Sequence, residues 1–155
     1  SGKTTLLRHI LQGGEGLTIS SKVVFGVYEQ MDYQFHKDET VLDYMKARSD
    51  YDEGKIRSSL NSMGFTGNDL KKNIRHLSGG EAIRLVLCHL FLGRFNVLIL
   101  DEPTNFLDVF CIEALELFLQ GYDGTVLLVS HDRTFLERVA DDVYLLEDRK
   151  LKLRN

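Results

Sequence analysis

Residues 97–102 read Val97-Leu98-Ile99-Leu100-Asp101-Glu102, four apolar side chains in a row followed at once by two carboxylates. A short continuous apolar run is typical of a strand that is buried on both faces of a parallel sheet. In such sheets ligands bind at the edge formed by the carboxyl ends of the strands. The stretch therefore predicts an α/β fold with a polar site at this edge. The alternative is a buried strand followed by an ordinary polar turn.

The segments around this stretch alternate between strand and helix patterns. The other expected strands are Leu17–Ile19, Val23–Tyr28, Thr125–Val129, which we also expect to be buried, and Asp142–Leu146. The expected helices cover residues 4–11, 40–48, 56–63, 79–92, 109–120 and 132–140. Strands that alternate with helices indicate a parallel sheet with helical connections. Residues 38–75 are polar and helical, which predicts a small helical subdomain inserted in the sheet domain, with residues 64–75 as a connector.

Length and composition fit one globular domain. Of the 155 residues, 43% are hydrophobic and 27% are charged, so a buried core can form. The net charge of −4 argues against a broad basic surface, and we expect no direct DNA binding. No apolar run approaches the ~20 residues of a membrane helix, and no signal peptide is present, which together predict a cytoplasmic location. Cys88 and Cys111 lie among apolar residues and are expected to be reduced core thiols.

The first residues, Ser1-Gly2-Lys3-Thr4-Thr5, match the second half of a phosphate-binding P-loop. Backbone N–H groups at the start of a helix attract phosphate oxygens, and the helix dipole assists them. Lys3 would add positive charge, and the Thr4 hydroxyl is placed for Mg²⁺. The alternative is a chance Gly-Lys-Thr at a helix start, because the first P-loop glycine is not in the sequence. Since the chain also begins without Met, we expect it to be part of a longer protein.

Polar residues at the expected strand ends are candidates for catalysis. Asp101 is expected to bind Mg²⁺ through water, and Glu102 is the candidate general base for the attacking water. Gln30 follows the Val23–Tyr28 strand and would orient that water and contact Mg²⁺, or else cap a turn. His131 follows Thr125–Val129 and would contact the γ-phosphate, although a hydrogen-bonded structural histidine is the more common finding at such a position.

The segment Leu77-Ser78-Gly79-Gly80-Glu81 supports two compatible interpretations. Ser78 and Glu81 have the spacing of an ordinary capping box at a helix start. Two glycines in a first helical turn are unfavourable for the helix, whereas close approach of the backbone to a phosphate requires them. A capped, glycine-rich helix start is itself an anion site.

The motifs in this order resemble the nucleotide-binding domain of ATP-binding cassette (ABC) proteins. The matching motifs are a partial Walker A (Gly2-Lys3-Thr4), a Q-loop (Gln30), a signature (Leu77 to Glu81), a Walker B (Asp101-Glu102), a D-loop (Asp108) and an H-loop (His131). The segment Asp101-Glu102-Pro103-Thr104-Asn105-Phe106-Leu107-Asp108 is similar to the F subfamily, whose members carry two such domains in one soluble chain. Phe106 stands where many members have His.

The resemblance implies an ABC ATPase fold, a P-loop NTPase sheet core truncated at its N-terminus. It implies one domain over residues 1–155, with residues 38–95 as the helical, signature-bearing subdomain, and ATP and Mg²⁺ as cofactors. A second cassette would pack head to tail, so that Ser78, Gly79, Gly80, Glu81 and Asp108 contact nucleotide held by the other P-loop.

F-subfamily proteins act on the ribosome, in regulating translation or in protection from antibiotics. The resemblance therefore implies ribosome or tRNA partners, contacted through regions outside this sequence. The alternatives are the ATPase subunit of a membrane transporter and a degenerate module that acts by interaction alone.

Overall fold

The computed structural model describes residues 2–154 and contains a sheet of three parallel strands. The strand order is β1 (Phe25–Tyr28), β2 (Val97–Asp101) and β3 (Thr125–Val129), so β2 lies in the centre. The three middle residues of β2 are at most 1% exposed. The predicted α/β fold around a central buried strand is confirmed.

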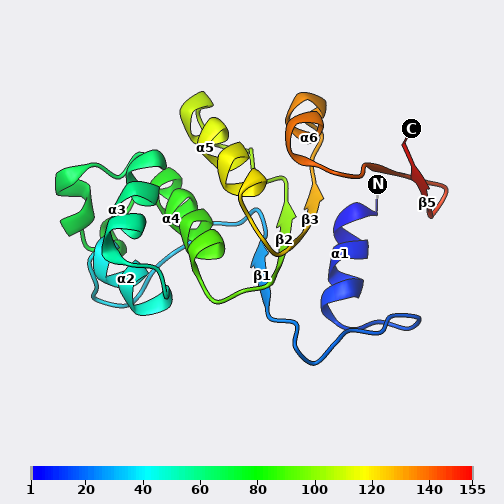
Figure 1. Ribbon diagram of the computed structural model, residues 1–155, viewed down its shortest axis with the longest axis horizontal. Coiled ribbons are helices and arrows are strands. Elements are labelled where there is room, and N and C mark those ends of the chain that lie inside the picture. Colours follow the sequence, from blue (N-terminus) through cyan, green and yellow to red (C-terminus); the bar gives the residue numbers. More distant parts are fainter. Residues whose placement is uncertain (1, 155) are drawn as a thin grey trace.

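Helices surround this sheet (Figure 1). Next to β3 lies α1 (Lys3–Leu11), and α4 (Gly79–Leu92) packs against β1 at the opposite edge. Between β2 and β3 the chain forms α5 (Val109–Gln120), which packs against α6 (Arg133–Val139). The bounds of α5 are those that the apolar periodicity predicted.

Residues 41–92 form a cluster of helices, which we call the helical lobe (Figure 1). Its members are α2 (Val41–Arg48), α3 (Glu53–Ser62), the 3₁₀ helices η1 (Gly67–Lys71) and η2 (Ile74–His76), and α4. Met45, Leu60 and Met63 are fully buried in it. Thr40 and Asp52 accept hydrogen bonds from backbone N–H groups in the first turns of α2 and α3, which fixes where those helices begin.

The last predicted strand does not join the parallel sheet. It forms β4 (Tyr144–Glu147), which pairs antiparallel with β5 (Lys150–Leu153) in a separate hairpin. Asp148 and Arg149 connect the two strands with φ of 47° and 60°. Two positive φ values in a two-residue loop are the requirement of a type I′ hairpin turn. This local turn pairs β4 with the residues that follow it.

Two other local predictions are wrong. Leu17–Ile19 is not a strand, because three residues without a pairing partner gain no ladder hydrogen bonds. The connector at residues 64–75 is not purely polar loop, since it contains η1 and begins η2. Leu70 and Ile74 from these helices are buried in the core.

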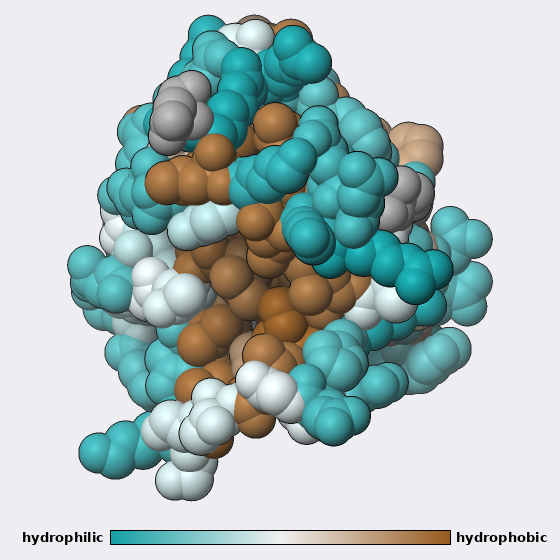
Figure 2. All heavy atoms as spheres, turned by 90° about the vertical axis from the view of Figure 1, so that its right-hand side faces the viewer, coloured by the Kyte–Doolittle hydropathy of each residue, from teal (hydrophilic) through white to brown (hydrophobic). Residues whose placement is uncertain are grey.

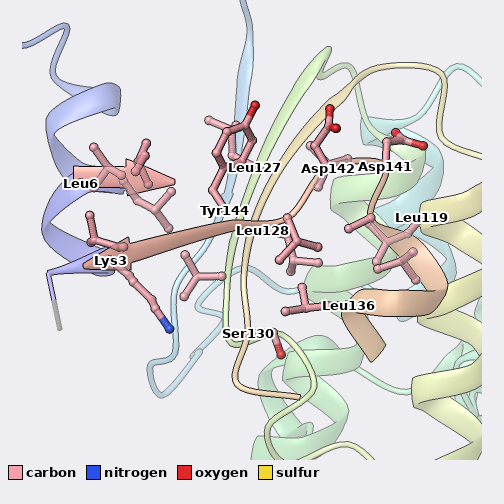
Figure 3. Close-up of a pocket in the computed structure, with 18 of the residues that line it drawn as sticks. Lys3, Leu6, Leu119, Leu127, Leu128, Ser130, Leu136, Asp141, Asp142 and Tyr144 are labelled. Atoms are coloured by element: carbon pink, nitrogen blue, oxygen red, sulfur yellow. The ribbon is translucent and has the colours of Figure 1, made fainter. Parts of the chain in front are cut away.

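A cavity of ≈ 520 Å³ lies between α1, β3 and the hairpin (Figure 3). Its walls are mainly apolar and include Leu6, Leu128 and Leu136. Figure 2 shows the same region as a hollowed hydrophobic face. The outer edge of β3 pairs with no strand within residues 2–154. As a result, β3 is half-buried at most, and not buried as predicted.

Replacing Leu98 by Ala should lower the free energy of unfolding by about 2–5 kcal/mol, because a fully buried side chain leaves a cavity in the centre of the sheet. The same replacement at Leu117, which is 70% exposed on α5, should change it by less than about 0.5 kcal/mol. Urea unfolding followed by circular dichroism measures both values. Equal losses at the two positions would contradict the packing described above.

Candidate active site

The carboxyl ends of the three parallel strands bring the predicted residues to one edge of the sheet. Asp101 is the last residue of β2 and pairs in register with Val129 of β3. The ladder continues for one residue, because the Glu102 N–H donates to the Val129 carbonyl at 2.8 Å. His131 follows two residues after Val129, and Gln30 follows two residues after β1.

Thr4, in the first turn of α1, lies against Asp101 although 97 residues separate them in the chain. Its hydroxyl donates to Asp101 Oδ2 at 2.7 Å. Gly2, the N-cap of α1, has φ 113°, and no side chain caps the helix start. A hydroxyl, a carboxylate and an uncapped helix N-terminus are thereby gathered at one point. Oxygen ligands of this kind suit Mg²⁺, and a helix start of this kind suits phosphate.

Lys3 and Thr5 flank this point on α1. Lys3 is half-buried and stands on the wall of the cavity, with Ser130 of the β3 end on the opposite wall (Figure 3). Thr5 is exposed in the first turn. Ser1, the remaining predicted P-loop residue, lies outside the described residues.

Glu102 and His131 form the second contact at this edge. His131 Nδ1 lies in hydrogen-bonding contact with Glu102 Oε1, and the His131 backbone N–H donates to Glu102 Oε2 at 3.3 Å. The Glu102 side chain is 16% exposed, whereas that of His131 is 80% exposed. Glu102 has φ 51°, a left-handed conformation that costs energy for a residue with a side chain. The surrounding structure thus holds this carboxylate in place at some cost.

A third contact joins Asn105, a residue for which the sequence predicted no role in the site, to Gln30. Asn105 Nδ2 donates to Gln30 Oε1 at 3.1 Å. The two residues are 75 positions apart, so no local pattern indicates their contact. The only available signal was the place of Asn105 shortly after the two carboxylates.

The predicted capping box at the start of α4 is present. Ser78 Oγ accepts from the Glu81 N–H at 3.2 Å, and Glu81 Oε2 accepts from the Ser78 N–H at 3.0 Å. Lys72 Nζ donates to Glu81 Oε1 at 2.9 Å and, with the Ser78 N–H, lowers the pKa of Glu81. Within residues 2–154 no hydrogen bond or ion pair joins Ser78–Glu81 to Thr4, Asp101, Glu102 or His131.

Asp108 also caps a helix. Its Oδ1 accepts from the Cys111 N–H at 2.8 Å at the start of α5, and this bond lowers the pKa of Asp108. The residue therefore has a structural task beside any contact with nucleotide.

No group of three or more His, Cys, Asp or Glu residues suited to hold a metal ion occurs in the described part of the chain. Of the predicted Mg²⁺ residues, Thr4 and Asp101 are together, and Gln30 is bonded to Asn105. This small set fits an ion that takes its other ligands from phosphate and water.

A family model described as ABC transporter matches residues 1–105. The chain belongs to this ABC family. Domains of the ABC family bind ATP, which agrees with the nucleotide class predicted from the motifs. No helix among residues 2–154 is both long and apolar enough to span a membrane.

Three curated relatives of this ABC domain illustrate the similarity. The erythromycin resistance ATP-binding protein MsrA of Staphylococcus epidermidis is 41% identical over 97% of this chain and 30% of its own length. The putative ATP-binding protein YdiF of Bacillus subtilis is 40% identical over 97% of this chain and 24% of its own. The ATP-binding protein Uup of Escherichia coli is 38% identical over 94% of this chain and 24% of its own length. The chain thus spans a quarter to a third of these relatives, and they confirm the resemblance to the F subfamily.

Solved structures confirm the ABC ATPase fold. An RNase-L inhibitor superposes with a TM-score of 0.75 at 22% identity, over 92% of this chain and 29% of its own. An archaeal ribosome recycling factor, in a complex with a ribosomal stalk protein, superposes with a TM-score of 0.75 at 23% identity. The match covers 92% of this chain and 29% of that protein. A putative cobalt transport ATP-binding protein superposes with a TM-score of 0.71 at 19% identity. The match covers 97% of this chain and 62% of that protein. At these identities the likeness concerns the fold alone.

Phe106 and Phe110 provide a test of the backbone strain beside the site. Both rings are exposed, at 73% and 79%, but Phe106 has φ 65° whereas Phe110 lies in α5. At position 106 the Gly variant should be more stable than the Ala variant by about 1 kcal/mol, because glycine adopts positive φ without a clash. At position 110, in the first turn of α5, the order should reverse, because glycine is less favourable than alanine in a helix. Urea unfolding of the four variants measures both differences, and the same order at both positions would refute the strain at Phe106.

Proposed function

We propose that this chain binds ATP with Mg²⁺ at the carboxyl edge of its sheet and hydrolyses the ATP, as one cassette of a longer protein that acts on the ribosome. The observation that carries the proposal is the 2.7 Å hydrogen bond from the Thr4 hydroxyl to Asp101. It joins the helix start that suits phosphate to the strand end that suits a metal. Family membership and the uncapped start of α1 support the same assignment.

The phosphate groups of ATP would be held by the P-loop residues Ser1, Gly2, Lys3, Thr4 and Thr5. Backbone N–H groups at the start of α1 would bind phosphate oxygens, and Lys3 would add charge. Thr4, Gln30 and Asp101 would hold Mg²⁺, directly or through water. The ion would neutralise the charge that develops on the transferred phosphoryl group.

Glu102 would act as the general base that takes a proton from the attacking water. Its contact with His131 Nδ1 fixes the direction of the carboxylate and leaves His131 Nε2 for an oxygen of the γ-phosphate. Gln30 would orient the water. Each role requires a side chain placed to within a fraction of an ångström. The left-handed backbone conformation of Glu102, which the surrounding structure enforces, supports such a placement.

The signature residues would act on a second cassette. Among residues 2–154, no hydrogen bond or ion pair joins Ser78–Glu81 to Thr4, Asp101, Glu102 or His131, and we infer that these signature residues contact nucleotide held by a partner P-loop. Asp108 would contribute at the same contact. In this proposal residues 1–155 are one domain, and residues 38–95 form the helical subdomain that carries the signature.

Action on the ribosome rests on the F-subfamily relatives. One of them is named as an erythromycin resistance protein, so the biological effect would be either protection of the ribosome from antibiotics or regulation of translation. Ribosome and tRNA contacts would come from regions outside this sequence, in the cytoplasm. The alternative is the ATPase subunit of a membrane transporter, in keeping with the description of the matching family model.

Replacing Glu102 by Gln in the complete protein should leave ATP binding nearly unchanged and slow hydrolysis by about 10²–10⁴-fold, because only the proton acceptor is lost. Nucleotide affinity by equilibrium dialysis and phosphate release measure the two effects. Glu113→Gln, on the exposed face of α5, is the matched control and should keep the parent rate. A Glu102→Gln protein with the parent rate would exclude Glu102 as the base.

The Glu102→Gln protein also distinguishes action on the ribosome from the alternative function as a transporter subunit. Because it would keep ATP bound, it should sediment with ribosomes in the presence of ATP and be released from them when ATP is omitted. Sucrose-gradient fractions of a cell extract measure this distribution. Recovery with the membrane fraction, and absence from the ribosome fraction, would favour the transporter.

A further inference from the structure

The Asn105–Gln30 contact connects two segments that the proposed mechanism treats separately. Asn105 belongs to the segment after Glu102, and Gln30 belongs to the segment after β1. Asn105 Nδ2 donates to Gln30 Oε1 at 3.1 Å. Gln30 is exposed and its side chain makes no other hydrogen bond among residues 2–154, so this donor alone restrains its amide.

Hydrogen bonds within its own turn hold the backbone around Asn105. The Asn105 N–H donates to the Glu102 carbonyl at 3.3 Å, and the Leu107 N–H donates to the Thr104 carbonyl at 3.2 Å. Two residues with left-handed φ, Glu102 and Phe106, stand on either side of it. Such conformations persist only where the surrounding structure enforces them. These contacts hold Asn105 in place beside Gln30.

We propose that Asn105 is a positioning residue that acts through Gln30. A glutamine side-chain amide can be rotated so that either its oxygen or its nitrogen faces a given point. An N–H donor on Oε1 selects one of these orientations. Since an amide oxygen has two acceptor positions, Oε1 can bond to Asn105 and still face a metal-bound water. This inference rests on the role of Gln30 in the proposed function.

The simpler interpretation is that the bond only ties two loops together. In that case its loss would affect stability and leave the reaction unchanged. The positioning role predicts the opposite pattern, a lower kcat with an unchanged KM, because the phosphate-holding residues on α1 are untouched.

The test uses a double-mutant cycle in the complete protein, with Asn105→Ala, Gln30→Ala and both together. Asn105→Ala should lower kcat for ATP by about 10-fold, within the effect expected from a misplaced reacting group, and change KM by less than about 2-fold. It should also raise the Mg²⁺ concentration needed for half-maximal rate. The double variant should be no slower than Gln30→Ala alone, since coupled residues are not additive.

Two further variants keep the result clear. Asn105→Asp has the same shape without an N–H to donate, and it should lose as much activity as Asn105→Ala. Asn96→Ala removes another asparagine, whose side chain bonds the Val24 N–H and the Lys22 carbonyl far from the site. It should lower stability while leaving kcat and the Mg²⁺ dependence unchanged.

Three outcomes would overturn the inference, and they have different meanings. Additive effects of Asn105→Ala and Gln30→Ala, or a parent rate for Asn105→Ala, would remove Asn105 as a positioning residue and leave the role of Gln30 intact. A parent rate for Gln30→Ala would remove the proposed role of Gln30 itself, and with it the inference. ATP hydrolysis that still depends on Glu102 would then preserve the rest of the proposed function.

Discussion

Parallel pairing of β2 with both of its neighbours is the constraint on which the site depends. It sets the carboxyl ends of three strands side by side, so that residues from positions 30, 101 and 131 reach one edge. The central strand is held there by burial, which contributes roughly 25 cal/mol for each Å² of apolar surface removed from water. The hydroxyl of Thr4 then joins α1 to the same edge. This hydrogen bond is exposed to water, so its contribution to stability is small. Its importance is that it places Thr4 beside Asp101.

Backbone strain is concentrated where the chemistry is proposed. Of the non-glycine residues with positive φ, Glu102 and Phe106 lie in the segment after β2, and Asp148 and Arg149 form the hairpin turn. The turn has an obvious structural reason, whereas the segment after β2 has none in the sheet itself. Its conformation directs Glu102 toward His131 and Asn105 toward Gln30. Backbone strain that orients side chains, and that packing does not require, is characteristic of functional segments.

The sequence predicted those elements whose signals are local. Val109–Gln120 and Thr125–Val129 have their predicted bounds, and α2 begins one residue later than predicted because Thr40 is its cap. The prediction that the last strand joins the parallel sheet was wrong. The turn Asp148-Arg149 lacks the Asn-Gly signature of a hairpin, although it adopts hairpin angles. The Asn105–Gln30 contact spans 75 residues, and periodicity carries no information at that range. The candidate site was thus predictable as a set of strand ends, but its internal bonds were not.

The two glycines at the start of α4 have no explanation within the chain. A Cβ atom added at Gly79 or at Gly80 would meet no heavy atom within 4 Å, and neither residue has a positive φ. The capping box is complete without them, because Ser78 and Glu81 supply it. In a helix, glycine is less favourable than alanine by up to about 1 kcal/mol. Neither backbone angle nor packing within residues 2–154 requires glycine at these two positions. Close approach of a phosphate group to bare backbone would require glycine, and a phosphate held by a second cassette would make such an approach.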